Sequence, residues 1–148
     1  MWIFTSEPSG RAYKELIDFA SEVCNGFILV RRCDDINESV DILLKQLGDF
    51  LIEIKEQQGW PGTQLLEGYA NVYYYKLNTT TKEVLKKYSE SLYSWLEPNL
   101  LEDLCFLKKD RQPWLVSIAH EQFSWIDNNT WDEIDRLMSI EGIMLEEQ

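Results

Sequence analysis

The chain has 148 residues, which is the commonest size for a single domain and is long enough to bury one hydrophobic core. A hydrophobic fraction of 45% and an aromatic fraction of 13% exclude a disordered chain. The formal net charge of −12 disfavours binding to nucleic acid and to anionic membranes, because both carry negative charge. We therefore expect residues 1–148 to form one globular domain that binds neither.

The cysteines indicate a reducing compartment. Cys24, Cys33 and Cys105 are far apart in the chain, no CxxC spacing occurs, and three thiols cannot all pair. Residues 1–10 lack the basic segment followed by an apolar segment that is typical of a signal peptide. No apolar run in the chain is long enough to cross a bilayer. These observations predict a cytoplasmic protein with free thiols.

The first thirty residues predict a strand, a helix and a second strand. Trp2–Thr5 is a short apolar run, and apolar residues then recur at helical spacing between residues 10 and 24. Phe27–Val30 is apolar on both faces, which is typical of a central strand covered on both sides. A strand–helix–strand unit of this kind predicts two parallel strands joined by a right-handed crossover.

The rest of the chain alternates between strands and helices without a linker or a repeat. The predicted elements are a helix capped by Asn37, a strand at Phe50–Lys55, a loop at Glu56–Thr63, a tyrosine-rich strand at Gly68–Leu77, a helix from Thr80 to about Leu96, an acidic connector at Asn99–Asp103, a hairpin of Leu104–Leu107 with Trp114–Ala119, a short strand at Phe123–Ile126 and a helix from Thr130 that ends at Gly142. The fold class is therefore α+β, with a single mixed β-sheet that starts with a βαβ unit and is covered by about four helices.

Two loops of the predicted βαβ unit carry candidate ligand-binding residues. Ser6, Ser9 and Arg11 follow the first strand, and Arg31 and Arg32 follow the second. Ligands bind beyond the carboxyl ends of parallel strands, and a helix N-terminus favours an anion. The five residues are therefore predicted to share one rim around a small anionic ligand. In the alternative interpretation, Ser9 caps the helix and the two arginines neutralise nearby carboxylates.

The turn Gly59–Gly62 presents Trp60 as a candidate partner-binding residue. Trp60 either projects outward as an interface anchor or folds back to cap the core. His120 is the only histidine, and no neighbouring motif completes a catalytic or metal-binding set around it. We therefore predict a structural or peripheral role for His120, no catalytic residue, no metal and no cofactor.

Three segments of the chain carry a resemblance to known proteins. They read WIFTSEPSGR at Trp2–Arg11, WPGTQLL at Trp60–Leu66 and EDLCFLKKDRQPWLVSIAHE at Glu102–Glu121. They resemble a group of small acidic bacterial proteins without an established activity, some of which carry a label taken from a stage III sporulation protein. The last segment is also similar, more weakly, to segments of bacterial toxin-immunity proteins. The resemblance implies no catalytic residues.

Charge and the absence of a catalytic motif favour a protein-binding or accessory module, immunity-like or sporulation-associated. From Glu121 to Gln148 eight acids stand against one base, which suits a basic protein partner. The alternative function is a small enzyme or an anionic-ligand-binding domain that uses the loops after the first two strands. The sequence does not indicate an oligomeric state.

Overall fold

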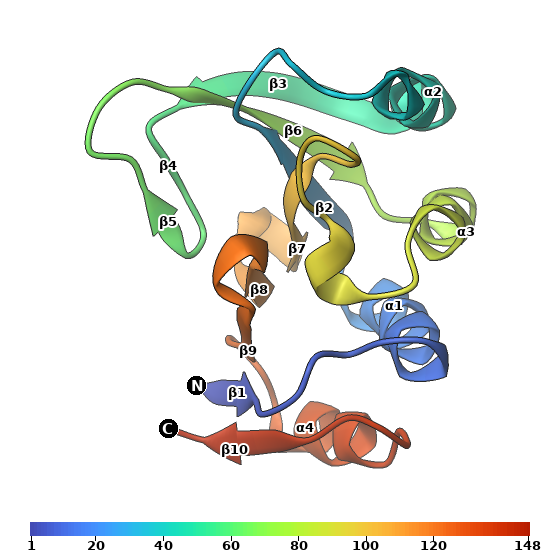
Figure 1. Cartoon of the computed structure of the whole chain (residues 1–148). Coiled ribbons are helices and arrows are strands. Elements are labelled where there is room, and N and C mark those ends of the chain that lie inside the picture. Colours follow the sequence, from blue (N-terminus) through green and yellow to red (C-terminus); the bar gives the residue numbers. More distant parts are fainter.

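A computed structural model describes residues 1–148 as an α+β fold built on one eight-stranded sheet (Figure 1). The strands of this sheet are β1 (Trp2–Phe4), β2 (Gly26–Arg31), β3 (Leu51–Gln57), β6 (Ala70–Lys76), β7 (Glu102–Leu107), β8 (Pro113–Ile118), β9 (Phe123–Ile126) and β10 (Leu145–Glu147). The α-helices are α1 (Arg11–Val23), α2 (Glu38–Leu47), α3 (Thr79–Tyr88) and α4 (Trp131–Met138). The predicted α+β class is confirmed.

The sheet is antiparallel throughout, in the order β10-β1-β9-β8-β7-β2-β6-β3. Strands β1 and β2 point the same way, because four antiparallel pairings connect them, but three other strands lie between them. The two strands of the predicted βαβ unit are therefore parallel but not adjacent, and the prediction of a mixed sheet is wrong, because every pairing in the sheet is antiparallel. Strand β2 is nevertheless central, because it pairs with β6 on one edge and with β7 on the other. Its apolar residues contribute to a core on each face of the sheet.

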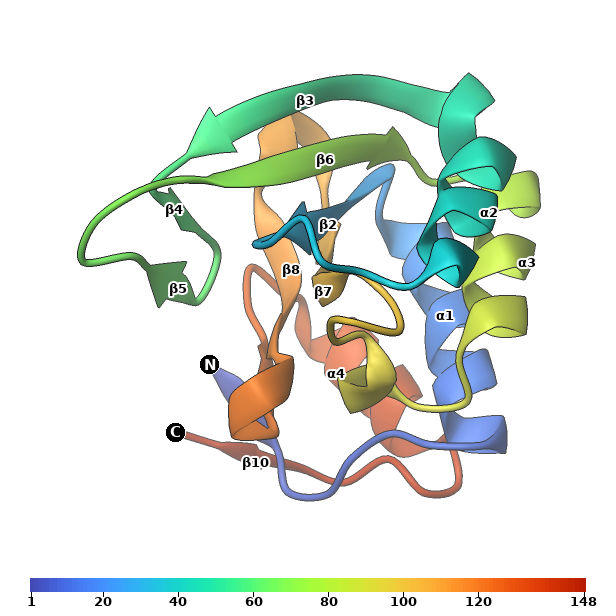
Figure 2. The same cartoon turned by 45° about the horizontal axis from the view of Figure 1, so that its top comes forward.

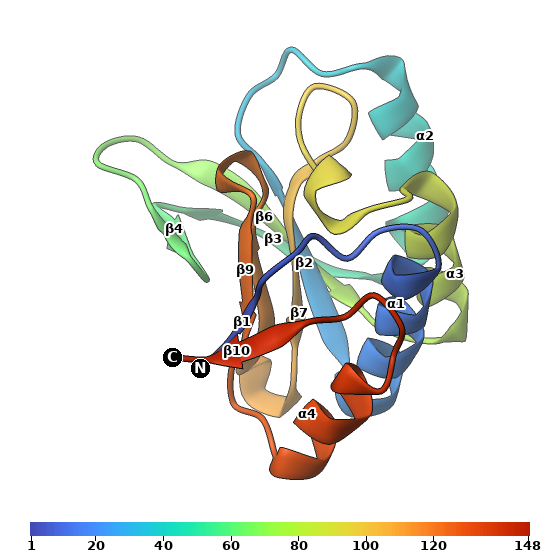
Figure 3. The same cartoon turned by 60° about the horizontal axis from the view of Figure 1, so that its bottom comes forward.

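All four helices contribute to one large core on a single face of the sheet (Figures 1 and 3). The opposite face carries a smaller core, in which Trp60 packs with residues such as Val30, Val72 and Val116. The two termini lie side by side, because β1 and β10 pair with each other. None of the helices has the length and the apolar character needed to cross a bilayer.

The smaller core is covered by a two-stranded arm that leaves the sheet between β3 and β6 (Figure 2). The arm consists of β4 (Gly59–Trp60) and β5 (Thr63–Gln64), where the sequence predicted a loop. Gly62 turns the chain with φ +87°, and a Cβ there would lie 2.9 Å from Val116 Cγ1. Only glycine allows both the backbone angle and this close approach, which presses the turn onto β8.

Helix α3 begins and ends at places other than those predicted. Asn78 caps it, because its Oδ1 accepts the N–H of Thr81 at 2.9 Å while Thr81 Oγ1 accepts the N–H of Asn78 at 2.9 Å. The helix ends early, at Tyr88, and the Ser89 hydroxyl then donates to the carbonyl oxygen of Ser91 at 2.7 Å and accepts the N–H of Ser91 at 3.2 Å. Serine hydroxyls offer the backbone an alternative to helical hydrogen bonds, which explains the early end.

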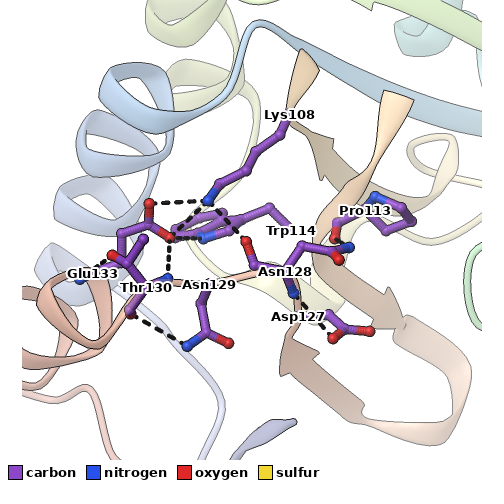
Figure 4. Close-up of polar contacts among 8 residues, drawn as sticks. All are labelled: Lys108, Pro113, Trp114, Asp127, Asn128, Asn129, Thr130 and Glu133. Carbon is purple, nitrogen blue, oxygen red and sulfur yellow. Dashed lines mark hydrogen bonds and ion pairs between the residues drawn. The ribbon is translucent and has the colours of Figure 1, made fainter. Parts of the chain in front are cut away.

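Helix α4 is fixed to the hairpin of β7 and β8 through one carboxylate (Figure 4). Glu133 Oε1 accepts hydrogen bonds from Lys108 Nζ at 2.9 Å, from Trp114 Nε1 at 3.0 Å and from the N–H of Thr130 at 3.2 Å. Thr130 Oγ1 in turn accepts the N–H of Glu133 at 3.1 Å. The predicted start of this helix at Thr130 is confirmed, since Thr130 caps it, and the glutamate of this capping box also binds the sheet.

Candidate functional site

The carboxyl end of β2 meets the arm and the 3-10 turn η4 (Ala119–Glu121), which follows β8. A pocket of about 470 Å³ lies at this junction, lined by Arg32, His120, Glu121 and the arm residues 62–67. A second pocket, of about 360 Å³, also has Arg32 in its wall and lies against the start of β6. The two pockets therefore flank Arg32 at this end of the sheet.

Glu102, Asp103 and His120 converge beside Arg32. One potential ligand atom from each of the three side chains lies within 4.8 Å of the other two. Adjacent residues of a regular strand point to opposite faces, yet both carboxylates reach the same point. The backbone explains this, because Asp103 has φ +56° and the register between β2 and β7 shifts there. Such a conformation in a residue other than glycine costs free energy and is concentrated at functional sites.

Asp103 is fully buried and joins three elements. Its Oδ1 accepts the backbone N–H of Ala119 at 3.0 Å, and its Oδ2 accepts Trp60 Nε1–H at 3.1 Å. These two donors fix the orientation of the carboxylate. They also hold the arm and the turn η4 against the start of β7.

Glu102 is 8% exposed and lacks the hydrogen bonds that a buried carboxylate requires. Its Oε2 has no hydrogen-bond partner, and its one ion pair is with Arg32 Nη1 at 3.5 Å. Burial raises the pKa of the Glu102 carboxyl above its ordinary value, and the negative charges of Asp103 and Glu97 raise it further. The charge of Arg32 opposes this rise without cancelling it.

Arg32 and His120 form the part of the site that faces solvent. The Arg32 guanidinium lies 5.7 Å from the centre of the Trp60 ring, and its backbone N–H donates to Glu97 Oε2 at 3.0 Å. His120 is exposed, and its imidazole makes no hydrogen bond to the protein. Both side chains can therefore move without breaking the fold.

The predicted ligand rim is not assembled. Ser6, Ser9 and Arg11 follow β1, which lies four strand positions, or roughly 19 Å, from β2. Arg11 forms an ion pair with Glu15 at 3.4 Å, and α1 begins at Gly10 without a side-chain cap. The alternative role of Ser9 as a helix cap is therefore also wrong. The anionic-ligand function that relied on a shared rim loses its geometric basis.

Other predicted site residues lie elsewhere than expected or have other contacts. Arg31 and Arg32 do line a common pocket, but Arg32 pairs with Glu102, and Arg31 Nε is buried without an acceptor. Trp60 is 5% exposed, so the prediction of an outward anchor is replaced by the core-capping alternative. Its indole N–H is bound to Asp103, which draws the ring inward.

Sequence reasoning missed the two carboxylates of the cluster. The acidic connector predicted at Asn99–Asp103 includes Glu102 and Asp103, whereas in the structure these two residues begin the buried strand β7. Two acids directly before an apolar run were the available signal, since carboxylates at the start of a buried strand need partners. Sequence neighbours of His120 could not reveal its partners, because Glu102 and Asp103 lie 18 and 17 residues earlier in the chain.

Neither a family model, nor a curated protein, nor a solved structure matches the chain. The function is therefore inferred from the geometry and the charge of the site. Two carboxylates, an imidazole and a guanidinium around a pocket form a set that binds charged groups.

Proposed function

We propose that this protein is a binding module for a basic partner protein, which docks on the arm side of the sheet. The observation that carries the proposal is a group of four carboxylates that line the two pockets flanking Arg32 and form no ion pair within the chain. They are Asp34, Glu56, Glu67 and Glu121. These four carboxylates outnumber the two arginines of the pockets, Arg31 and Arg32, and an excess of negative charge attracts a basic partner.

Apolar side chains lie among these carboxylates. Leu66 is fully exposed in the segment that returns from the arm to β6, and Tyr69 is 64% exposed nearby. Protein interfaces combine an apolar centre, often with tyrosine, and a polar rim. Leu66 and Tyr69 supply such a centre, and the carboxylates supply the rim.

An accessory or immunity-like role agrees with this surface. A protein of that kind acts by occupying its partner and needs a selective surface rather than a catalytic centre. The net charge of −12 speeds capture of a basic partner, because long-range attraction raises the association rate.

Site-specific crosslinking in the host cell tests the proposal. With a photo-crosslinking residue in place of Leu66, we expect one discrete, basic protein to be captured, in a yield that falls as the salt concentration rises. The matched control carries the same residue in place of Ile42, which is exposed on α2 on the helical side. Identical products at both positions, or none at Leu66, would overturn the proposal.

Charge reversal identifies the face that binds. In the Leu66 crosslinking background, Glu67→Lys with Glu121→Lys is expected to lower the yield by about tenfold or more, as steering charges are reversed. Asp135→Lys with Glu141→Lys makes the same change of charge on the exposed C-terminal part of the chain and should leave the yield nearly unchanged. A greater loss in the second variant would show that the C-terminal acids, and not the arm side, hold the partner.

A further inference from the structure

The cluster of Glu102, Asp103 and His120 contains side chains that bind metal ions, and it lies beside an open pocket. Carboxylate oxygens and a neutral imidazole nitrogen are the usual oxygen and nitrogen ligands of first-row divalent ions. The two carboxylates come from the start of β7 and the imidazole from the turn η4. Their potential ligand atoms lie within 4.8 Å of one another.

The state of Glu102 is a second, independent observation that points to a cation as ligand. The residue is more than nine-tenths buried, and its Oε2 accepts no hydrogen bond. The Arg32 contact at 3.5 Å is too long for a good charge-assisted hydrogen bond. A buried carboxylate oxygen without a donor is costly, and a coordinated cation would satisfy it.

Asp103 is oriented in the way that is typical of a metal ligand. Each of its oxygens accepts one hydrogen bond, from the N–H of Ala119 and from Trp60 Nε1, and each keeps a second lone pair. Outer partners of this kind hold a ligating carboxylate in place and tune its affinity.

His120 and Arg32 make room for an ion. The imidazole is exposed and unbonded, so its rotation can bring a ring nitrogen closer to the two carboxylates. The Arg32 side chain is 34% exposed and can withdraw toward solvent. An ion in this position would keep an open coordination site on the pocket that His120 lines.

We propose that Glu102, Asp103 and His120 bind a divalent transition-metal ion of the Zn²⁺ type at the edge of the pocket beside the arm. Three protein ligands, one of them an imidazole, fit such an ion better than Ca²⁺, which takes about six to eight oxygens. The metal site does not depend on the partner-binding proposal, because none of its three ligands is among the carboxylates proposed to contact the partner.

Calorimetric titration of the full-length chain with Zn²⁺ tests the site. The experiment uses a Cys33→Ser background, because Cys33 is the only exposed thiol and could bind zinc on its own. We expect one equivalent to bind and the melting temperature to rise with it. His120→Ala and Glu102→Gln should each weaken binding by about tenfold or more, since ligand loss is at least as costly as loss of an outer partner.

The control and a spectroscopic readout make the result decisive. Glu121→Gln removes the exposed carboxylate next to His120 and should change the affinity by less than about twofold, as it removes no ligand. Co²⁺ bound in place of Zn²⁺ should give a visible absorption band that His120→Ala abolishes. Undiminished binding by His120→Ala, no binding by the parent, or equal binding of Mg²⁺ would each overturn the site. The exposed position of His120 means that this variant retains the fold.

Discussion

At the scale of single residues, Glu102 shows a conflict between the stability of the fold and the candidate site that its carboxylate helps to form. The charged carboxylate is buried without hydrogen bonds, while the side chain of its ion-pair partner Arg32 is one-third exposed and can be hydrated. Because the pKa of Glu102 is raised in the folded state, folding favours its protonated form. The wild-type protein therefore loses stability as the pH rises from the ordinary carboxyl pKa through the raised one.

We predict that Glu102→Gln raises the free energy of unfolding at neutral pH by about 1 kcal/mol, because a neutral amide avoids the buried charge. Urea unfolding in the presence of a chelator measures this free energy. The difference between the variant and the wild type should be larger at pH 8 than at pH 5. A less stable variant would mean that the ion pair with Arg32 outweighs the cost of burial.

The backbone at Asp103 explains why residue patterns could not predict this site. A sequence-based interpretation assumes that neighbouring strand residues alternate between the two faces. The positive φ of Asp103 breaks the alternation, and no local signal announces it, because aspartate rarely adopts this angle. By contrast, the burial of Trp60 was one of the two predicted alternatives, since size alone makes tryptophan mostly buried.

At the scale of elements, the N-terminus of α4 depends on Glu133. Glu133→Ala is expected to lower the free energy of unfolding by about 3 kcal/mol, because it removes a cap and leaves Lys108 and Trp114 Nε1 unpaired. Chemical denaturation measures the change. Thr130→Ala is the matched control, and it should cost only about 1 kcal/mol, because it removes only the cap.

Equal losses in Glu133→Ala and Thr130→Ala would contradict this interpretation. They would show that Glu133 acts only within its own helix and that its contacts with Lys108 and Trp114 across the interface add nothing. The Lys108 side chain is only 19% exposed, which argues against that outcome, since an unpaired charge that is partly buried is costly.

Elements with a periodic pattern or a cap were predictable, whereas three of the shortest strands were not. The spacing of apolar residues located α1, and the capping box located α4. Strand β10 and the two strands of the arm have only two or three residues each, too few for a pattern of alternation. They form because the strands and side chains that they contact are already in place.

At the scale of the whole molecule, strand order was beyond the reach of the sequence. The apolar run at Phe27–Val30 correctly indicated a central strand, since Leu29 is fully buried. It could not indicate which strands lie beside it, because an apolar central strand can pair with antiparallel neighbours, here β6 and β7, as well as with parallel ones. The candidate site lies at such a junction of distant segments, so it became visible only when the pairing was known.

The thiols report on the integrity of the whole fold. Cys24 and Cys105 are buried and Cys33 is exposed. Burial raises the pKa of Cys105 to about 12 and also raises that of Cys24, which keeps both in the unreactive thiol form. We predict that a thiol reagent labels only Cys33 quickly in the native protein and labels all three cysteines after unfolding without a reductant.

The slow labelling of Cys24 and Cys105 should follow global unfolding, because the two residues belong to the cores on opposite faces of the sheet. Both rates should therefore rise together with urea concentration. A much faster reaction at Cys105 alone would show that the arm opens while the helical side stays folded, since Cys105 packs in the small core beneath Trp60. Fewer than three reactive thiols after unfolding would reveal a disulfide and contradict the expectation of a reducing compartment.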